Sequence, residues 1–68
     1  MLLFVCTSGK ENIIEIVTSD KGLALKCLND GLCDNVFEED TDRSYDEICR
    51  IVLEGCMDMT LEDLRLDL

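Results

Sequence analysis

Residues 2–18 have the sequence LLFVCTSGKENIIEIVT, and this stretch decides the fold class. Its two ends, residues 2–7 and 12–18, are rich in β-branched and aromatic side chains, and a polar segment containing Gly9 joins them. Two such runs with a short polar connection predict a β-hairpin. The first run is apolar on both faces, so we expect that strand to be central in its sheet or covered twice, by a helix or by another subunit.

A helix and a third strand are expected after the hairpin. Ser19 and Asp20 are candidate N-caps for a helix over residues 21–29, and Gly31 is suited to end it in a left-handed conformation. Residues 32–38 then have the composition of a strand, which we expect to be short because Asp and Asn in its middle are poor strand formers.

Ser44 followed three residues later by Glu47 has the spacing of a capping box and predicts a second helix, extending to about residue 55. At 100° per residue its apolar side chains share one wide arc. These are Tyr45, Ile48, Cys49, Ile51, Val52 and Cys56. The helix is therefore amphipathic, with one face directed to the core.

The C-terminal segment fits two patterns. Thr60 is a candidate N-cap for a short helix whose apolar residues would be Leu61, Leu64 and Leu68, whereas Leu64, Leu66 and Leu68 also alternate as in a strand. We favour the helix, because two acidic residues follow the cap, where the positive end of a helix dipole stabilises them.

Together these segments predict one domain, residues 1–68, of the α+β class: an antiparallel three-stranded sheet with two or three helices packed on one face. Hydrophobic residues make up 47% of the chain and Pro is absent, which argues against disorder. The longest apolar run is too short for a signal peptide or a membrane span, so we expect a complete, soluble, cytoplasmic protein.

The cysteines indicate reduced, buried thiols. They are Cys6, Cys27, Cys33, Cys49 and Cys56. Their number is odd, no secretion signal precedes them, and they fall within apolar patterns, where a thiol acts as a small hydrophobe. A disulfide between Cys27 and Cys33 is the alternative. A zinc site is not expected, because the chain has no His and no C-x-x-C spacing.

The charge is strongly negative and unevenly distributed. The formal net charge is -10. Residues 1–29 contain three Lys and three acidic residues, whereas residues 30–68 contain three Arg and thirteen acidic residues. Clustered like charges destabilise a compact chain, and dispersed acids would serve solubility as well. The segregation therefore indicates a carboxylate-rich face, with a solvated acidic surface that binds nothing as the alternative.

The candidate partner-binding residues are the acidic residues of the second half, together with one leucine at the border of the acidic helix surface. They are Glu38, Glu39, Asp40, Asp42, Asp46, Glu47, Leu53, Asp58, Glu62 and Asp63. The complementary partner is a basic protein surface, including that of a nucleic-acid-handling protein. Direct binding of nucleic acid is disfavoured, since it requires a density of Lys and Arg.

These observations lead to a main functional hypothesis, a small interaction protein that inhibits or modulates a basic protein by mimicking nucleic acid. Small acidic proteins of this type and size are typical of phages and mobile elements. The alternative is a self-associating assembly module that uses the apolar sheet surfaces, and a homodimer is compatible with both hypotheses.

Other chemistry has little support in the sequence. Oxygen-bearing residues alternate from Asp40 to Asp46 as in an EF-hand loop, but Tyr45 stands where that loop needs Gly, and Ile51 where it needs a bidentate Glu. We therefore predict no metal or other cofactor. Without His, a phosphate-binding glycine loop or an activated nucleophile, an enzyme is not expected.

Overall fold

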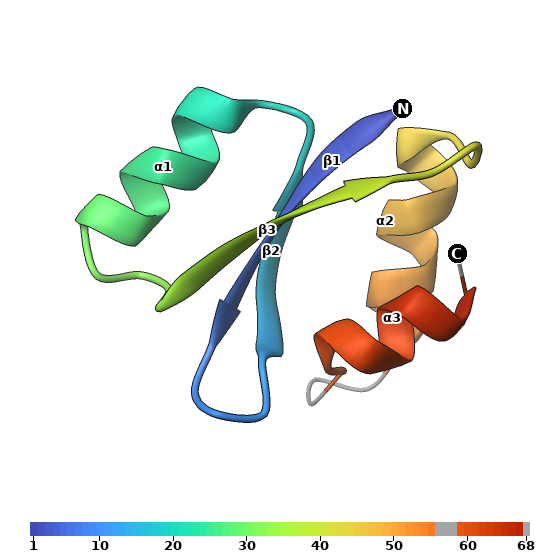
Figure 1. The fold of residues 1–68 in the computed structure, drawn as a ribbon. Coiled ribbons are helices and arrows are strands. Elements are labelled where there is room, and N and C mark those ends of the chain that lie inside the picture. The colour runs from blue at the N-terminus through green and yellow to red at the C-terminus, as the bar shows by residue number, and fades with distance from the viewer. Residues whose placement is uncertain (56–58, 68) are drawn as a thin grey trace.

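The computed structural model describes residues 1–55 and 59–67. Three strands and three helices follow one another in the predicted order (Figure 1). They are β1 (Leu2–Ser8), β2 (Ile13–Thr18), α1 (Lys21–Asn29), β3 (Asn35–Asp40), α2 (Tyr45–Glu54) and α3 (Leu61–Asp67). The strands form one antiparallel sheet in the order β2-β1-β3, which confirms the α+β class and the central position of the first strand.

The hairpin between β1 and β2 turns through two residues with positive φ. Gly9 has φ of 74° and Asn12 has φ of 54°, a region that Gly and Asn tolerate better than other residues. The amide of Asn12 donates to the carbonyl of Gly9 at 3.3 Å and closes the turn. The turn thus lies at the opposite end of the sheet from the pair Leu2 and Asp40, where β3 ends.

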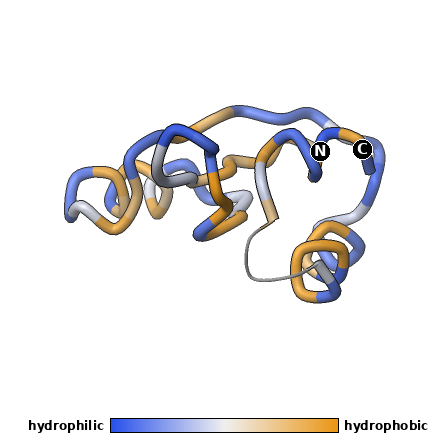
Figure 2. Tube along the Cα trace, turned by 90° about the horizontal axis from the view of Figure 1, so that it is seen from below, coloured by the Kyte–Doolittle hydropathy of each residue, from blue (hydrophilic) through white to orange (hydrophobic). Residues whose placement is uncertain are grey.

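The two faces of β1 pack against different helices. Leu3 and Val5 belong to a core cluster with Ile48 of α2 and with Leu61 and Leu64 of α3. On the other face, Phe4 and Cys6 form a second cluster with two α1 residues, Ala24 and Cys27, and with Cys33. Figures 1 and 2 show α1 on one side of the sheet and α2 with α3 on the other.

The expectation that all helices pack on one face was therefore wrong. A central strand that is apolar at every inner position needs cover on both faces, and this chain supplies both covers itself. The helix between β2 and β3 covers one face, and the two C-terminal helices cover the other.

The third strand begins later and ends later than predicted, at Asn35–Asp40 in place of residues 32–38. The reason is the way α1 ends. Gly31, with φ of 76°, donates its amide to the carbonyl of Leu28 at 3.3 Å, and Leu32 donates to the carbonyl of Cys27 at 2.9 Å. This pair of bonds is a Schellman motif, so Gly31 terminates the helix as predicted. The amide of Leu32 is still bonded to the helix, and the strand therefore begins only at Asn35.

Both C-terminal helices begin at the predicted caps. The Ser44 hydroxyl accepts the amide of Glu47 at 3.2 Å, and α2 ends at Glu54. At α3 the box is reciprocal: the amide of Asp63 donates to the Thr60 hydroxyl and the amide of Thr60 donates to the Asp63 carboxylate, each at 3.2 Å. The C-terminal segment is therefore a helix, as favoured, and not a strand.

The segment before α3 is tied to the outer edge of β2. The amide of Ile14 donates to the carbonyl of Met59 at 2.8 Å, and the amide of Leu61 donates to the carbonyl of Asn12 at 2.9 Å. Thr60 lies opposite Ile13 in a single antiparallel bridge. These bonds fix where the short α3 helix starts and hold it against the hairpin.

Candidate functional site

The structure places the predicted partner-binding residues in three regions. These are β3, the connection between β3 and α2 together with α2 itself, and the start of α3. Asp58 lies outside the described residues. The connection begins where β3 ends, next to Leu2, whereas α3 begins beside the hairpin turn at the other end of the sheet. The acidic residues of the connection and those of α3 therefore begin at opposite ends of the sheet.

The three acidic residues of β3 point to alternating sides of the sheet. Phe37 packs with the α2 and α3 layer and Val36 with the α1 layer, so alternation places Glu39 on the first side and Glu38 and Asp40 on the second. Consecutive carboxylates on this strand therefore do not share a face.

Glu39 is already neutralised within the chain. Its carboxylate accepts the Nε of Arg65 at 2.7 Å and lies 2.6 Å from Nη2 of the same guanidinium. The guanidinium also lies over the ring of Phe37, 5.9 Å from the centroid. Both nitrogens contact the same oxygen, Oε1 of Glu39, and this ion pair links β3 to α3. We therefore remove Glu39 from the surface offered to a partner.

Four carboxylates gather where β3 passes into α2. We call this group the acidic end, and its members are Asp40, Asp42, Asp46 and Glu47. All four residues are exposed. Asp40 lies 3.4 Å from the amino group of Met1, and Glu47 lies 3.7 Å from Arg43. For Asp42 and Asp46, no cationic group of the described residues lies within 4.0 Å.

The backbone beneath the acidic end is well held. Thr41 is buried, its amide donates to the carbonyl of Met1 at 3.0 Å, and its hydroxyl accepts the amide of Arg43 at 3.1 Å. The hydroxyl of Tyr45 donates to the carbonyl of Val17 at 3.2 Å and anchors the first turn of α2 over the sheet. The carboxylates are therefore presented from a fixed frame, and the amino end of α2 stabilises those in its first turn.

The leucine predicted to border the acidic helix surface lies on the exposed side of α2. Leu53 is 83% exposed, two turns beyond Asp46, so it extends the acidic surface with an apolar contact. Arg50 lies between them. Among the described residues, no carboxylate lies within 4.0 Å of this arginine.

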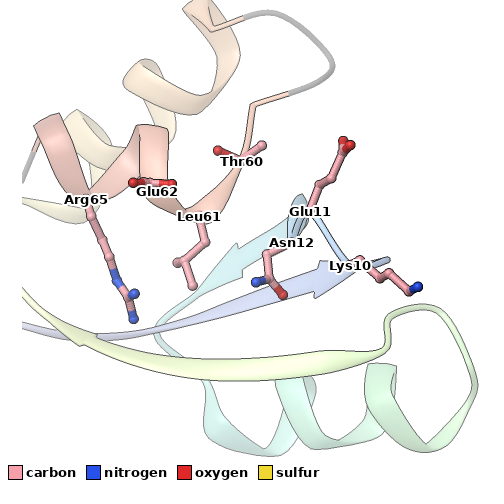
Figure 3. A pocket seen from close by; sticks show the side chains of 7 residues that line it. All are labelled: Lys10, Glu11, Asn12, Thr60, Leu61, Glu62 and Arg65. Atoms are coloured by element: carbon pink, nitrogen blue, oxygen red, sulfur yellow. The ribbon is translucent and has the colours of Figure 1, made fainter.

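The two predicted residues of α3 have different surroundings. Asp63 belongs to the helix cap and Glu62 lines an open groove between α3 and the hairpin turn (Figure 3). The groove has a volume of about 610 Å³. Its lining residues are Lys10, Glu11, Asn12, Thr60, Leu61, Glu62 and Arg65. Two cationic and two carboxylate side chains line the groove, so the groove favours neither an anionic nor a cationic ligand. Sequence reasoning missed it because its two walls are some fifty residues apart.

The thiols lie mostly in the core beneath α1. Cys6, Cys27 and Cys33 are buried and unpaired by disulfides, as predicted, and the alternative Cys27–Cys33 bond is not formed. Burial and the neighbouring Cys33 raise the pKa of the Cys6 thiol from 9.0 to about 11, which suppresses its nucleophilic thiolate form. Cys49 is a free, half-buried thiol, and Cys56 lies outside the described residues.

The described residues contain no group of three or more His, Cys, Asp or Glu side chains arranged to hold a metal ion. Comparison with protein-family models, with curated proteins and with solved structures finds no match to this chain. Across residues 1–55 and 59–67, no helix has the length and apolar character needed to cross a bilayer.

Proposed function

We propose that this chain is a small interaction protein that binds a basic protein surface through the acidic end and thereby inhibits or modulates its target. The observation that carries the proposal is the presence of Asp42 and Asp46, exposed and without a cation within 4.0 Å among the described residues, on a backbone that hydrogen bonds hold in place. Exposed carboxylates on a backbone that is held in place complement a cationic surface.

The distribution of the ion pairs supports this choice of residues. Glu39 is paired with Arg65, and Asp63 caps α3. These two carboxylates serve the fold. Asp42 and Asp46 make no comparable contact with residues 1–55 or 59–67, although clustering them beside Asp40 and Glu47 costs the protein self-repulsion. A partner that neutralises the cluster would remove that cost.

The target that fits best is a protein whose basic groove normally holds nucleic acid. Carboxylates at fixed positions occupy such a groove in place of phosphates, and association steered by charge is fast at low salt. The expected partner is a protein and not nucleic acid itself, because the acidic end would repel phosphates.

The test compares two variants that change the net charge equally. In the first, the acidic end is neutralised by Asp40→Asn, Asp42→Asn, Asp46→Asn and Glu47→Gln. In the second, four exposed carboxylates elsewhere are neutralised by Glu11→Gln, Glu54→Gln, Glu62→Gln and Asp67→Asn. Partners are captured from a lysate of the encoding organism at low salt and identified by mass spectrometry, and the purified partner is then titrated with each variant.

We expect the first variant to lose at least about a hundredfold in affinity and the second to stay within about fivefold of wild type, with both melting transitions preserved. Affinity of the wild type should fall steeply as salt rises. Equal losses in the two variants would show that net charge and not position matters, and salt-insensitive binding would refute the proposal.

The alternative hypothesis, self-association through the sheet, loses the surface on which it was based. Both faces of β1 are covered by the chain's own helices, and its inner residues are buried in the single chain. Exposed leucines lie on all three helices, at Leu23, Leu25, Leu28, Leu53 and Leu66.

A further inference from the structure

Strand β3 leaves one edge of the sheet open. In the order β2-β1-β3 each outer strand has a free side, and the bond from the amide of Ile14 to the carbonyl of Met59 covers part of the β2 side. Beside β3, no segment of residues 1–55 or 59–67 forms backbone hydrogen bonds on the side away from β1. Figure 1 shows β3 crossing in front of β1 and β2, with the helices to either side. An open row of amides and carbonyls is a template for a further strand.

The ladder between β1 and β3 identifies the backbone groups at this edge. The amide of Thr41 donates to the carbonyl of Met1 at 3.0 Å, and the amino group of Met1 donates to the carbonyl of Thr41 at 2.5 Å. In an antiparallel ladder every second pair exchanges two bonds in this way. The β3 residues of the intervening pairs therefore direct their amides and carbonyls outward. They are Val36, Glu38 and Asp40, and we call them the β3 edge.

The composition of β3 selects what this edge can bind. Natural proteins commonly block an open edge with Pro, Lys or a bulge, but β3 contains neither residue and pairs with β1 over six residues in one unbroken register. Its charged side chains are all acidic. Pairing of two β3 edges would bring Glu38 and Asp40 against the same carboxylates of a second copy, which like charges oppose. The edge therefore disfavours a second copy and favours a cationic strand.

The two carboxylates of the β3 edge are available to such a strand. Glu38 and Asp40 are exposed and lie on the same side of the sheet. Asp40 lies 3.4 Å from the amino group of Met1, and for Glu38 no cationic group of the described residues lies within 4.0 Å. Side chains directly opposite each other on neighbouring strands share a face. A strand added here would therefore pair with both carboxylates through cationic side chains at alternate positions.

We propose that an extended basic segment of the target protein adds to the β3 edge as a fourth, antiparallel strand, with Lys or Arg at alternate positions opposite Glu38 and Asp40. The inference rests on the proposed function for the sign of the partner's charge. Main-chain bonds supply affinity in this mode of recognition, and alternate side chains supply specificity. Asp40 belongs to both the β3 edge and the acidic end, so the added strand leads the target directly to the acidic end.

The probe is a capped peptide of about nine residues in which Lys alternates with Thr, long enough to span β3. It is titrated into the full chain under reducing conditions, and NMR follows each backbone amide. Binding should slow hydrogen exchange at the amides of Val36, Glu38 and Asp40. Two further peptides carry N-methyl groups on every Lys amide or on every Thr amide, at equal charge. The first should bind at least about tenfold more weakly, because its Lys amides face β3, and the second should stay within about threefold. Equal losses, or a larger loss for the second peptide, would overturn the proposal.

Protein variants separate this inference from the proposed function. Glu38→Pro removes a charge and an outward amide, a change that an edge strand tolerates, whereas Glu38→Gln removes the charge alone. The first should weaken the unmodified peptide at least about tenfold and the second less than about fivefold. Asp42→Asn with Asp46→Asn should weaken binding of the captured partner but change peptide binding less than about threefold. A peptide that responds to this last variant and leaves the β3 amides unprotected would overturn strand addition while the acidic end kept its role.

Discussion

Two leucines of α3 allow a direct test of the C-terminal structure. Leu64 is 1% exposed and Leu66 is 82% exposed. A helix places them on different sides, whereas a strand would place both on one face. Replacing each by Ala removes the same atoms from the same short element, so the difference between the two variants depends on burial alone.

The magnitude follows from the packing. Leu64 belongs to the core cluster with Leu3, Val5 and Ile48, and deleting a fully buried leucine side chain costs about 2–5 kcal/mol. We expect about 3 kcal/mol for Leu64→Ala and less than about 0.5 kcal/mol for Leu66→Ala. A domain of this length has a total stability of only about 3–10 kcal/mol, so the first loss is a large fraction of it.

The assay is urea denaturation followed by circular dichroism, under reducing conditions and at one protein concentration for all variants. A loss of 3 kcal/mol also lowers the melting temperature by more than about 10 °C in a domain of this size. Similar losses for Leu64→Ala and Leu66→Ala, or a loss below about 1 kcal/mol for Leu64→Ala, would refute the helical packing of α3.

Two further outcomes test the cap of α2 and the buried thiols. Ser44→Ala should cost about 1 kcal/mol because it removes the acceptor of the Glu47 amide, whereas Ser19→Ala, one residue before the Asp20 cap of α1, should be neutral in the same denaturation assay. The pKa of Cys6 is raised in the folded state, so stability is complete below pH 9 and should fall by about 2 kcal/mol as the pH rises to about 11. Cys6→Ala should lack most of this fall; an identical fall in that variant would contradict the assignment.

Local signals were enough to predict the order and class of the elements. The caps at Ser44 and Thr60, the turn at Gly9 and the helix end at Gly31 all depend on residues within four or five positions, which the sequence displays directly. The reciprocal bond of Asp63 also has a local signal, the spacing Thr-x-x-Asp, although we predicted that this carboxylate belongs to a partner-binding face.

Long-range packing could not be predicted in the same way. The face of the sheet that α1 covers depends on the strand order β2-β1-β3, in which α1 connects two strands that run parallel to each other. The pairing of Glu39 with Arg65 joins positions 26 residues apart. This ion pair changes the candidate site, since it removes one carboxylate from the surface offered to a partner.

Salt tests the proposed function without any variant. A basic partner is attracted to the acidic end, so raising the salt concentration should weaken its binding. Binding that stays unchanged as the salt concentration rises would mean that the contact does not depend on charge, and the acidic end would lose its assignment.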